Sequence, residues 1–253
     1  AYAAMLCSPD FVYLRPRPGK LDDFALASRL SYFLWSSMPD VTLMKLARAG
    51  ELSDAAELQR QVERMLNDPK AAAFVRHFPE RWLKLYKLGR MEPDKRGPYE
   101  HYFRVKNDLV PQVDAFFRDV LERNGPIRDF IDSDYTFLNS RLGELIYKQK
   151  VVGEHMRKVK LANPRRGGLL TMPAVMTVTA NGVDTSPIVR GVYVLENILG
   201  TPPPPPPPDV EPLSPDLRRA KTLKEQLAIH RNQEACRSCH QKIDPLEIGR
   251  AHV

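Results

Sequence analysis

Cysteine is scarce in this chain: it occurs three times among 253 residues, and Cys7 stands far from the other two. A tetrahedral zinc site usually combines two cysteine or histidine pairs, and the sequence has no second C-x-x-C and no H-x-x-x-H pair. Long apolar runs are also absent, so we expect no transmembrane segment in this chain. The phosphate-loop, dinucleotide-binding and G-x-S-x-G patterns are missing too, which excludes those nucleotide and hydrolase sites.

Charge is only mildly unbalanced, with a formal net charge of +7 and a pI near 9.3. Lysine and arginine are scattered, and no long basic run with interleaved aromatic residues occurs, so nucleic acid is not an expected partner. The basic excess favours an acidic protein, an anionic polymer or a membrane surface, but a solvated basic surface explains it more simply. Hydrophobic residues make up 43% and charged residues 27%, which is typical of a globular protein with a substantial core.

The two remaining cysteines lie in one compact motif, Cys236-Arg237-Ser238-Cys239-His240. This C-x-x-C-H pattern is the attachment signature of a c-type haem. Two thiols separated by two residues add across the vinyl groups at one edge of the porphyrin, and the following imidazole binds the iron as proximal ligand. Chance would produce about 0.001 such runs in a chain of this composition. We therefore expect Cys236, Cys239 and His240 to hold a covalent haem c, with His240 as the metal ligand.

Two other uses of the same residues stay open. Cys236, Cys239 and His240 supply three of the four ligands of a structural zinc site, although the fourth is not evident. A redox-active C-x-x-C pair normally follows a strand in a βαβ setting, whereas the residues before Cys236 have a helical pattern. An inert local pair of cysteines is the last alternative. Haem attachment stays the favoured interpretation, because the motif matches the attachment signature in full.

Residues 1–150 predict an all-helical domain. Apolar residues recur at three- and four-residue steps, and aspartate, serine, glycine and proline mark the ends of the segments. The expected helices cover 21–36, 41–49, 53–67, 70–85, 102–123, 126–131 and 140–147. Pro79 is expected to kink or split its helix and Pro111 to interrupt the 102–123 helix, while 132–139 is expected to be a connector.

Residues 151–246 predict an irregular and helical second domain. A helix is expected from Pro187 to Leu199, closed by Gly200. The seven prolines 202–208 predict a polyproline II strap of roughly 22 Å. A further helix over 216–232 would lead to the haem-attachment segment. The fold class expected for the whole chain is therefore all-α.

Several sequence blocks in a fixed order resemble one family. They are residues 26–37 with Pro39-Asp40, then 166–170, 185–187 with Arg190-Gly191, the proline run with Asp209-Val210, His230-Arg231, and the C-x-x-C-H motif with 243–246. The chain resembles large secreted cytochrome-c proteins of the planctomycete type, in which a helical domain of unknown function precedes a domain with the C-x-x-C-H motif. The resemblance implies an extracytoplasmic protein with further cytochrome or carbohydrate-binding modules, and it brings no reaction.

We expect the chain to be a fragment. Covalent haem attachment takes place outside the cytoplasm in bacteria, so an export signal is expected on a preceding part, with a periplasmic, secreted or cell-surface location. In the family that the chain resembles, Asp-Pro-Leu continues with a Gly-Phe-type segment, from which residues 247–253 depart. One back-translation of 247–253 contains a common sequencing-adapter string, so these residues are expected to be read-through and not native.

The leading functional hypothesis is electron transfer by the haem to a redox partner protein or a further domain of the same chain. Met156, Met172, Met176 and His230 are the candidate sixth ligands, although core or surface roles explain each of them better. A second hypothesis is a structural or binding scaffold for a polymer or protein surface, with an accessory haem or a zinc. A third is the electron-transfer part of an extracellular oxidoreductase, but Asp132, Asp134 and Glu144 fit caps and surface charges better than a catalytic pair.

Overall fold

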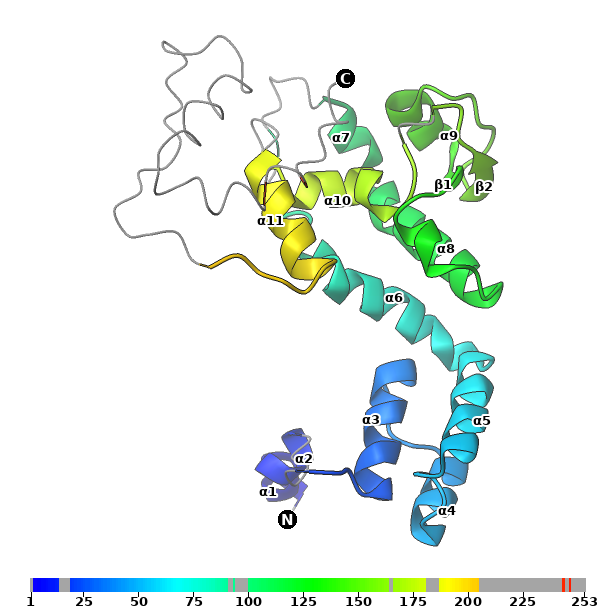
Figure 1. Cartoon of the computed structure of the whole chain (residues 1–253), viewed down its shortest axis with the longest axis vertical. Helices are drawn as coiled ribbons and strands as arrows, with labels where there is room; N and C mark the ends of the chain where they lie inside the picture. The colour runs from blue at the N-terminus through cyan, green and yellow to red at the C-terminus, as the bar shows by residue number, and fades with distance from the viewer. Residues whose placement is uncertain are drawn as a thin grey trace. The chain divides into compact units, whose positions relative to one another are not determined.

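The computed structural model describes residues 2–13, 19–90, 93, 100–163, 166–180, 187–204, 243 and 246. Over these ranges the chain is largely helical with one small sheet, which confirms the expected α-rich fold (Figure 1). The chain divides into two compact units, residues 1–78 and 79–253. Each unit has its own hydrophobic core.

The first unit is built from helices α1 to α5, η1 and most of α6. Their bounds are α1 Tyr2–Leu6, α2 Pro9–Val12, α3 Asp23–Trp35, α4 Val41–Ala49, α5 Ala55–Leu66, η1 Pro69–Ala71 and α6 Ala72–Trp82. Helices α3, α4 and α5 enclose a core of Ala27, Leu34, Trp35, Leu43, Ala47, Leu52 and Met65. The Trp35 indole Nε1 donates a hydrogen bond to the Met65 carbonyl at 2.9 Å, so its polar atom is satisfied inside this core.

Capping residues set the ends of these helices. Asp22, Asp40 and Asp54 are the N-caps of α3, α4 and α5, and each carboxylate accepts a backbone N–H of the first turn. Gly50 ends α4 with a φ of 70°, a left-handed conformation that costs glycine little. Helix α6 continues through Pro79 to Trp82, so the expected split at this proline does not occur.

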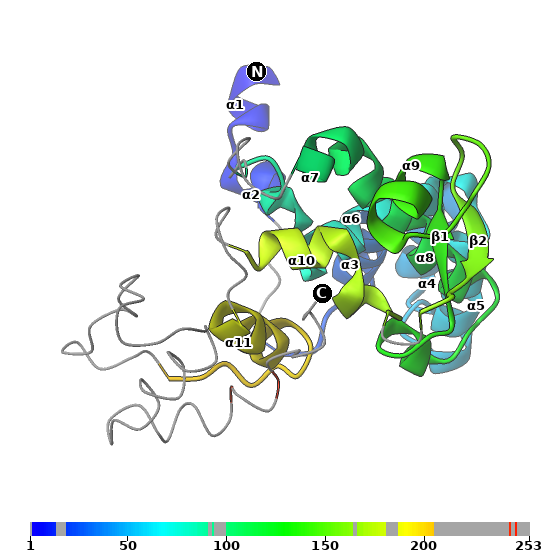
Figure 2. The same ribbon diagram turned by 90° about the horizontal axis from the view of Figure 1, so that it is seen from above.

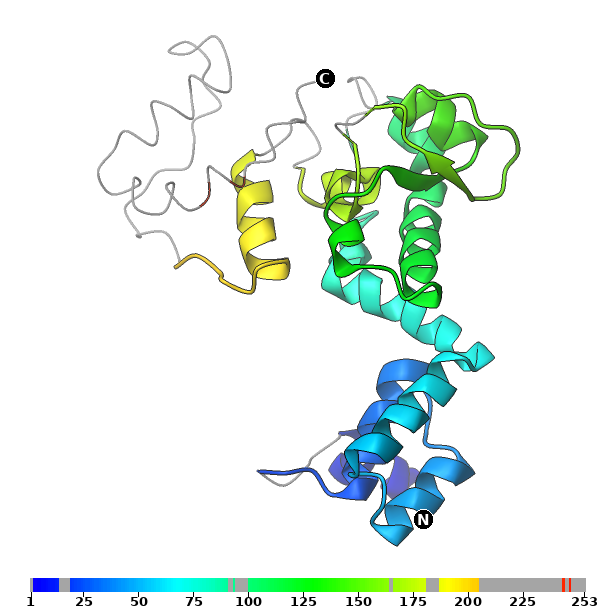
Figure 3. The same ribbon diagram turned by 45° about the vertical axis from the view of Figure 1, so that its right-hand side comes forward.

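The hydrophobic core of the second unit is built around α8, Leu109–Glu122. Figures 2 and 3 show the ribbon of this helix from two further directions. The elements before α8 are η2 Leu85–Lys87, α7 Glu100–Val105 and η3 Lys106–Asp108; those after it are η4 Ile127–Phe130, β1 Tyr135–Leu138, α9 Ser140–Leu142, η5 Gly143–Tyr147, β2 Arg157–Lys160, η6 Leu169–Thr171, α10 Pro173–Val178 and α11 Pro187–Asn197. Phe116 of α8 is fully buried and stacks on Tyr135 at 5.2 Å between ring centroids.

The connector expected at 132–139 is wrong, because it contains strand β1. β1 pairs antiparallel with β2, and the register joins Tyr135 to Lys160 and Leu138 to Arg157. Thr136 and Leu138 are buried while Tyr135 and Phe137 are only partly so, which is the two-residue alternation of a half-buried strand. The strand was missed because four residues are too short for this pattern to stand out between aspartate, serine and asparagine.

The helix expected over 102–123 is interrupted near Pro111, as predicted, and the break lies a few residues before the proline. Helix α7 ends at Val105, the 3-10 turn η3 follows, and α8 begins at Leu109. Pro111 therefore lies in the first turn of α8, where a backbone N–H has no intrahelical partner to lose.

One core serves both parts of the sequence that were expected to form separate domains. Leu109, Val113 and Phe116 of α8 belong to the same buried cluster as Met172 and Val194. The compact units of the structure divide at residue 78. Helices α10 and α11 bury their apolar side chains against the α8 core and form no separate one.

Helix α11 confirms the expected helix after Pro187, and Gly200 follows it with a φ of 64°. Pro202 to Pro204 lie in the described part without helix or strand. Residues 205–208 of the polyproline run and the helix expected at 216–232 lie outside the described residues. None of the helices that the structure describes has the length and apolar character needed to cross a bilayer.

Candidate functional site

The predicted haem-attachment residues Cys236, Cys239 and His240 lie outside the described residues. The chain immediately after them is described at two positions, Ile243 and Leu246. Ile243 is 5% exposed, and Leu246 is partly buried against the core around α8. The segment that follows the motif therefore has an anchor on the second unit.

The anchor of Ile243 is Gly191 on helix α11. A Cβ atom placed on Gly191 would lie 2.7 Å from the Ile243 Cγ2 and 2.8 Å from its carbonyl oxygen. Such distances are far below ordinary carbon contacts of 3.5–4.0 Å, so only glycine admits this approach. Glycine weakens a helix in whose interior it lies. The close approach of Ile243 explains why Gly191 nevertheless occurs inside α11.

Gly191→Ala should reveal this contact by the sign of its effect. Helix propensity alone would stabilise the protein by about 1 kcal/mol. The added methyl group would collide with Ile243, so we expect a net loss of about 1–3 kcal/mol in the free energy of unfolding, measured by denaturant titration. Val189→Ala, at a half-exposed position of the same helix, should change stability by less than about 0.5 kcal/mol. A stabilised Gly191→Ala variant would show that Ile243 does not pack there.

Helix α11 is itself held on the residues that end α6. The Trp82 indole donates to the Asn197 carbonyl at 2.7 Å, and the Tyr193 hydroxyl donates to the Leu83 carbonyl at 3.0 Å. Lys84 and Glu196 form an ion pair at 2.8 Å. Tyr193 is 6% exposed, and this burial raises the pKa of its hydroxyl, so it stays protonated as a donor. The docking surface for Ile243 is thus rigidly supported.

An arginine one residue before Gly191 is buried. Arg190 precedes Gly191 in α11 and is 2% exposed. Its Nε donates a long hydrogen bond, 3.4 Å, to the Thr179 hydroxyl oxygen at the end of α10. Its Nη2 is buried and has no hydrogen-bond partner among the described residues. Burial without a compensating charge lowers the pKa of this guanidinium from its ordinary value.

Family comparisons divide the chain into two matches. Residues 21–147 match PSD4, described as a protein of unknown function (DUF1592), and residues 166–250 match PSCyt3, also described as a protein of unknown function (DUF1588). The chain belongs to the PSD4 family. No curated protein and no solved structure matches it significantly. The two family names indicate cytochrome-related domains of the planctomycete type, which agrees with the resemblance seen in the sequence at this coarser level.

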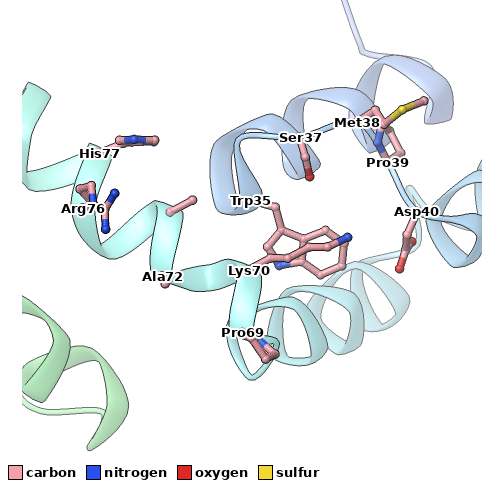
Figure 4. A pocket seen from close by; sticks show the side chains of 11 residues that line it. Trp35, Ser37, Met38, Pro39, Asp40, Pro69, Lys70, Ala72, Arg76 and His77 are labelled. Atoms are coloured by element: carbon pink, nitrogen blue, oxygen red, sulfur yellow. The ribbon is translucent and has the colours of Figure 1, made fainter.

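The part of the chain that matches PSD4 contains a groove in the first unit. Its cavity of about 550 Å³ is lined by residues that include Trp35, Asp40, Lys70, Arg76 and His77 (Figure 4). The Lys70 ammonium lies 4.7 Å from the centroid of the Trp35 ring. The His77 imidazole Nδ1 lies 2.9 Å from the Ser36 hydroxyl oxygen.

Asp40 in this groove forms hydrogen bonds with Arg64 and with the backbone of Leu43. Burial alone would raise its pKa, but the hydrogen bond from Arg64 at 2.8 Å and the backbone N–H of Leu43 hold the pKa below its ordinary value. An ionised carboxylate that caps α4 and pairs with α5 fixes the corner between helices. The Asp40 carboxylate therefore has a structural role.

The part of the chain that matches PSCyt3 contains, near its start, two consecutive glycines, Gly167 and Gly168, that pack closely against other backbone. A Cβ on Gly167 would collide with the Ser133 carbonyl oxygen. Gly168 has a φ of 67°, and its N–H donates a hydrogen bond to the Ser133 hydroxyl oxygen at 3.1 Å. These glycines thus allow close backbone packing. Among the described residues, no group of three or more histidine, cysteine, aspartate or glutamate side chains could hold a metal ion.

Asp132, Asp134 and Met172, which the sequence offered as candidate site residues, have structural contacts. Asp132 pairs with Arg128 at 3.2 Å and Asp134 with Lys160 at 4.0 Å, all four at exposed positions. Met172 is 1% exposed within the core, as its core interpretation predicted. Sequence reasoning assigned no role to Arg190, although a single arginine among Ile188, Val192 and Val194 was a usable signal.

Proposed function

We propose that the PSCyt3 part of this chain carries a covalent haem c that transfers electrons in an extracytoplasmic protein. The observation that carries the proposal is the C-x-x-C-H motif followed, three residues after His240, by the buried Ile243. The motif holds the thiols and imidazole that attachment requires. The family names are the second support.

The residues of the described part suit this role. Extended chain spans at most about 3.6 Å per residue, so covalent geometry keeps His240 within roughly 11 Å of Ile243. An attachment segment fixed to α11 at Ile243 and to the core at Leu246 would hold the group in one place. When bound, a haem of this kind supplies one-electron exchange. The chain then contributes a rigid support and an apolar neighbourhood, and the recipient is a partner protein or a further domain.

The test is to produce the parent protein behind an export signal in a host that matures c-type cytochromes. We expect a covalent haem band after denaturing electrophoresis, a pyridine haemochrome of the c type and one iron per chain. The Cys236→Ser/Cys239→Ser variant should lose covalent haem completely. Cys7→Ser is the matched control, since Cys7 is an exposed free thiol and its loss should leave the haem content unchanged.

Two results would contradict the proposal. Pure protein without haem but with one zinc per chain would assign Cys236, Cys239 and His240 to a structural metal site. Haem that cannot be reduced by dithionite and reoxidised by ferricyanide would separate the group from electron transfer. In that case the scaffold function would lead.

A further inference from the structure

Arg190 is a buried cation whose anion is missing from the described residues. Charged side chains are almost never fully buried without a partner, because removing an ion from water costs several kcal/mol. Thr179 does not compensate the charge, since its hydroxyl is neutral and lies within hydrogen-bond distance of the Val175 carbonyl at 2.9 Å and the Met176 carbonyl at 3.1 Å. It orients the Nε edge of the guanidinium and leaves the Nη2 atom unpaired.

A carboxylate is the group that this guanidinium fits. The planar fork of arginine matches the two oxygens of a carboxylate and binds them through paired, charge-assisted hydrogen bonds. The next residue, Gly191, touches Ile243, which follows the attachment motif by three residues. The residue with the unpaired donor and the residue that contacts Ile243 are therefore consecutive in α11.

We propose that Arg190 binds a carboxylate and that a propionate of the haem c attached at Cys236 and Cys239 supplies it. This inference rests on the proposed function. Thr179 and α10 hold the arginine side chain, Gly191 admits the attachment segment, and the guanidinium neutralises the propionate in a site closed to water. Arg190 would act as a positioning residue that also raises the reduction potential, because a nearby positive charge disfavours the oxidised haem.

The test compares Arg190→Gln in two backgrounds of the full chain. One is the haem-loaded protein, and the other is the Cys236→Ser/Cys239→Ser variant, which cannot attach haem. In the haem-loaded protein we expect Arg190→Gln to lower the melting temperature by about 4–8 °C and to lower the reduction potential. In the haem-free background the substitution removes an unpaired buried charge, so the melting temperature should stay unchanged or rise. Arg190→Lys should keep most of the potential and lose part of the melting temperature, since lysine retains charge but not the planar fork.

Three outcomes would overturn the inference. Equal destabilisation in both backgrounds would show that the carboxylate belongs to the chain itself. No change of melting temperature or potential in the haem-loaded protein would show that no anion binds there. If Arg190→Gln does not accumulate, Thr179→Val removes only the orienting hydroxyl, and an unchanged potential in that variant would count against the site. Failure of the proposed function is seen separately, as absence of haem before any substitution at Arg190.

Discussion

Cleavage of the folded chain at a protease site inserted between residues 163 and 166 should leave the two pieces bound to each other. The cut falls between the PSD4 and PSCyt3 matches. Five side chains beyond it, Leu169, Met172, Val175, Tyr193 and Val194, belong to the core around α8. At about 1.5–3 kcal/mol for each buried side chain, their burial contributes roughly 8–15 kcal/mol, as much as the whole net stability of a typical domain. Neither piece should fold the second unit cooperatively when it is expressed alone, whereas the first unit keeps its own core within the N-terminal piece.

Gel filtration of the cleaved protein and circular dichroism of the separate pieces measure these two outcomes. A cut placed between residues 13 and 19 is the control, because α1 buries no side chain. That cut should release the N-terminal peptide and leave the unfolding transition unchanged. Two folded pieces that separate on the column after the cut between 163 and 166 would show that the two family matches are independent domains.

Asp108→Ala should lower the free energy of unfolding by about 3 kcal/mol in denaturant titrations. Asp108 is 6% exposed, and its carboxylate accepts three hydrogen bonds of 2.8 Å, two from Arg141 and one from Asn139. Asn139 in turn caps α9 by accepting the Leu142 N–H. Removal of the carboxylate leaves a buried amide donor unpaired and loosens the junction of α8 with α9. Asp132→Ala, which breaks an exposed pair with Arg128, should cost less than about 0.5 kcal/mol.

The Asp108 carboxylate should make the free energy of unfolding depend on pH in the acidic range. The hydrogen bonds from Arg141 hold the pKa of Asp108 below its ordinary value of 3.8, and the bond from Asn139 adds to this against the opposing effect of burial. The unfolded chain therefore binds a proton at a higher pH than the folded chain does. The stabilisation from Asp108 is present above pH 3.8 and is lost as the pH falls through the lower folded pKa. The difference in stability between the native protein and Asp108→Ala should shrink over this range, and a constant difference would contradict the assignment.

Local patterns predicted much of the helical structure. The caps Asp40 and Gly50 and the helix that begins at Pro187 are where the sequence placed them. Such signals are readable because a capping side chain reaches backbone groups only two or three residues away. The C-x-x-C-H motif is local in the same sense, and the haem prediction made from it stays a prediction.

Contacts between distant residues were decided by the tertiary structure alone. Trp82 and Asn197 are 115 residues apart, and Tyr193 and Leu83 are 110 apart, yet these pairs hold α11 in place. Periodicity marks a residue as apolar but does not name its partner, so the core shared by the two family matches and the short strand β1 were not foreseen. The burial of Arg190 has the same origin: an arginine in a sequence is expected at the surface, and only the packing of α10 against α11 removes it from water and leaves its charge in need of an anion.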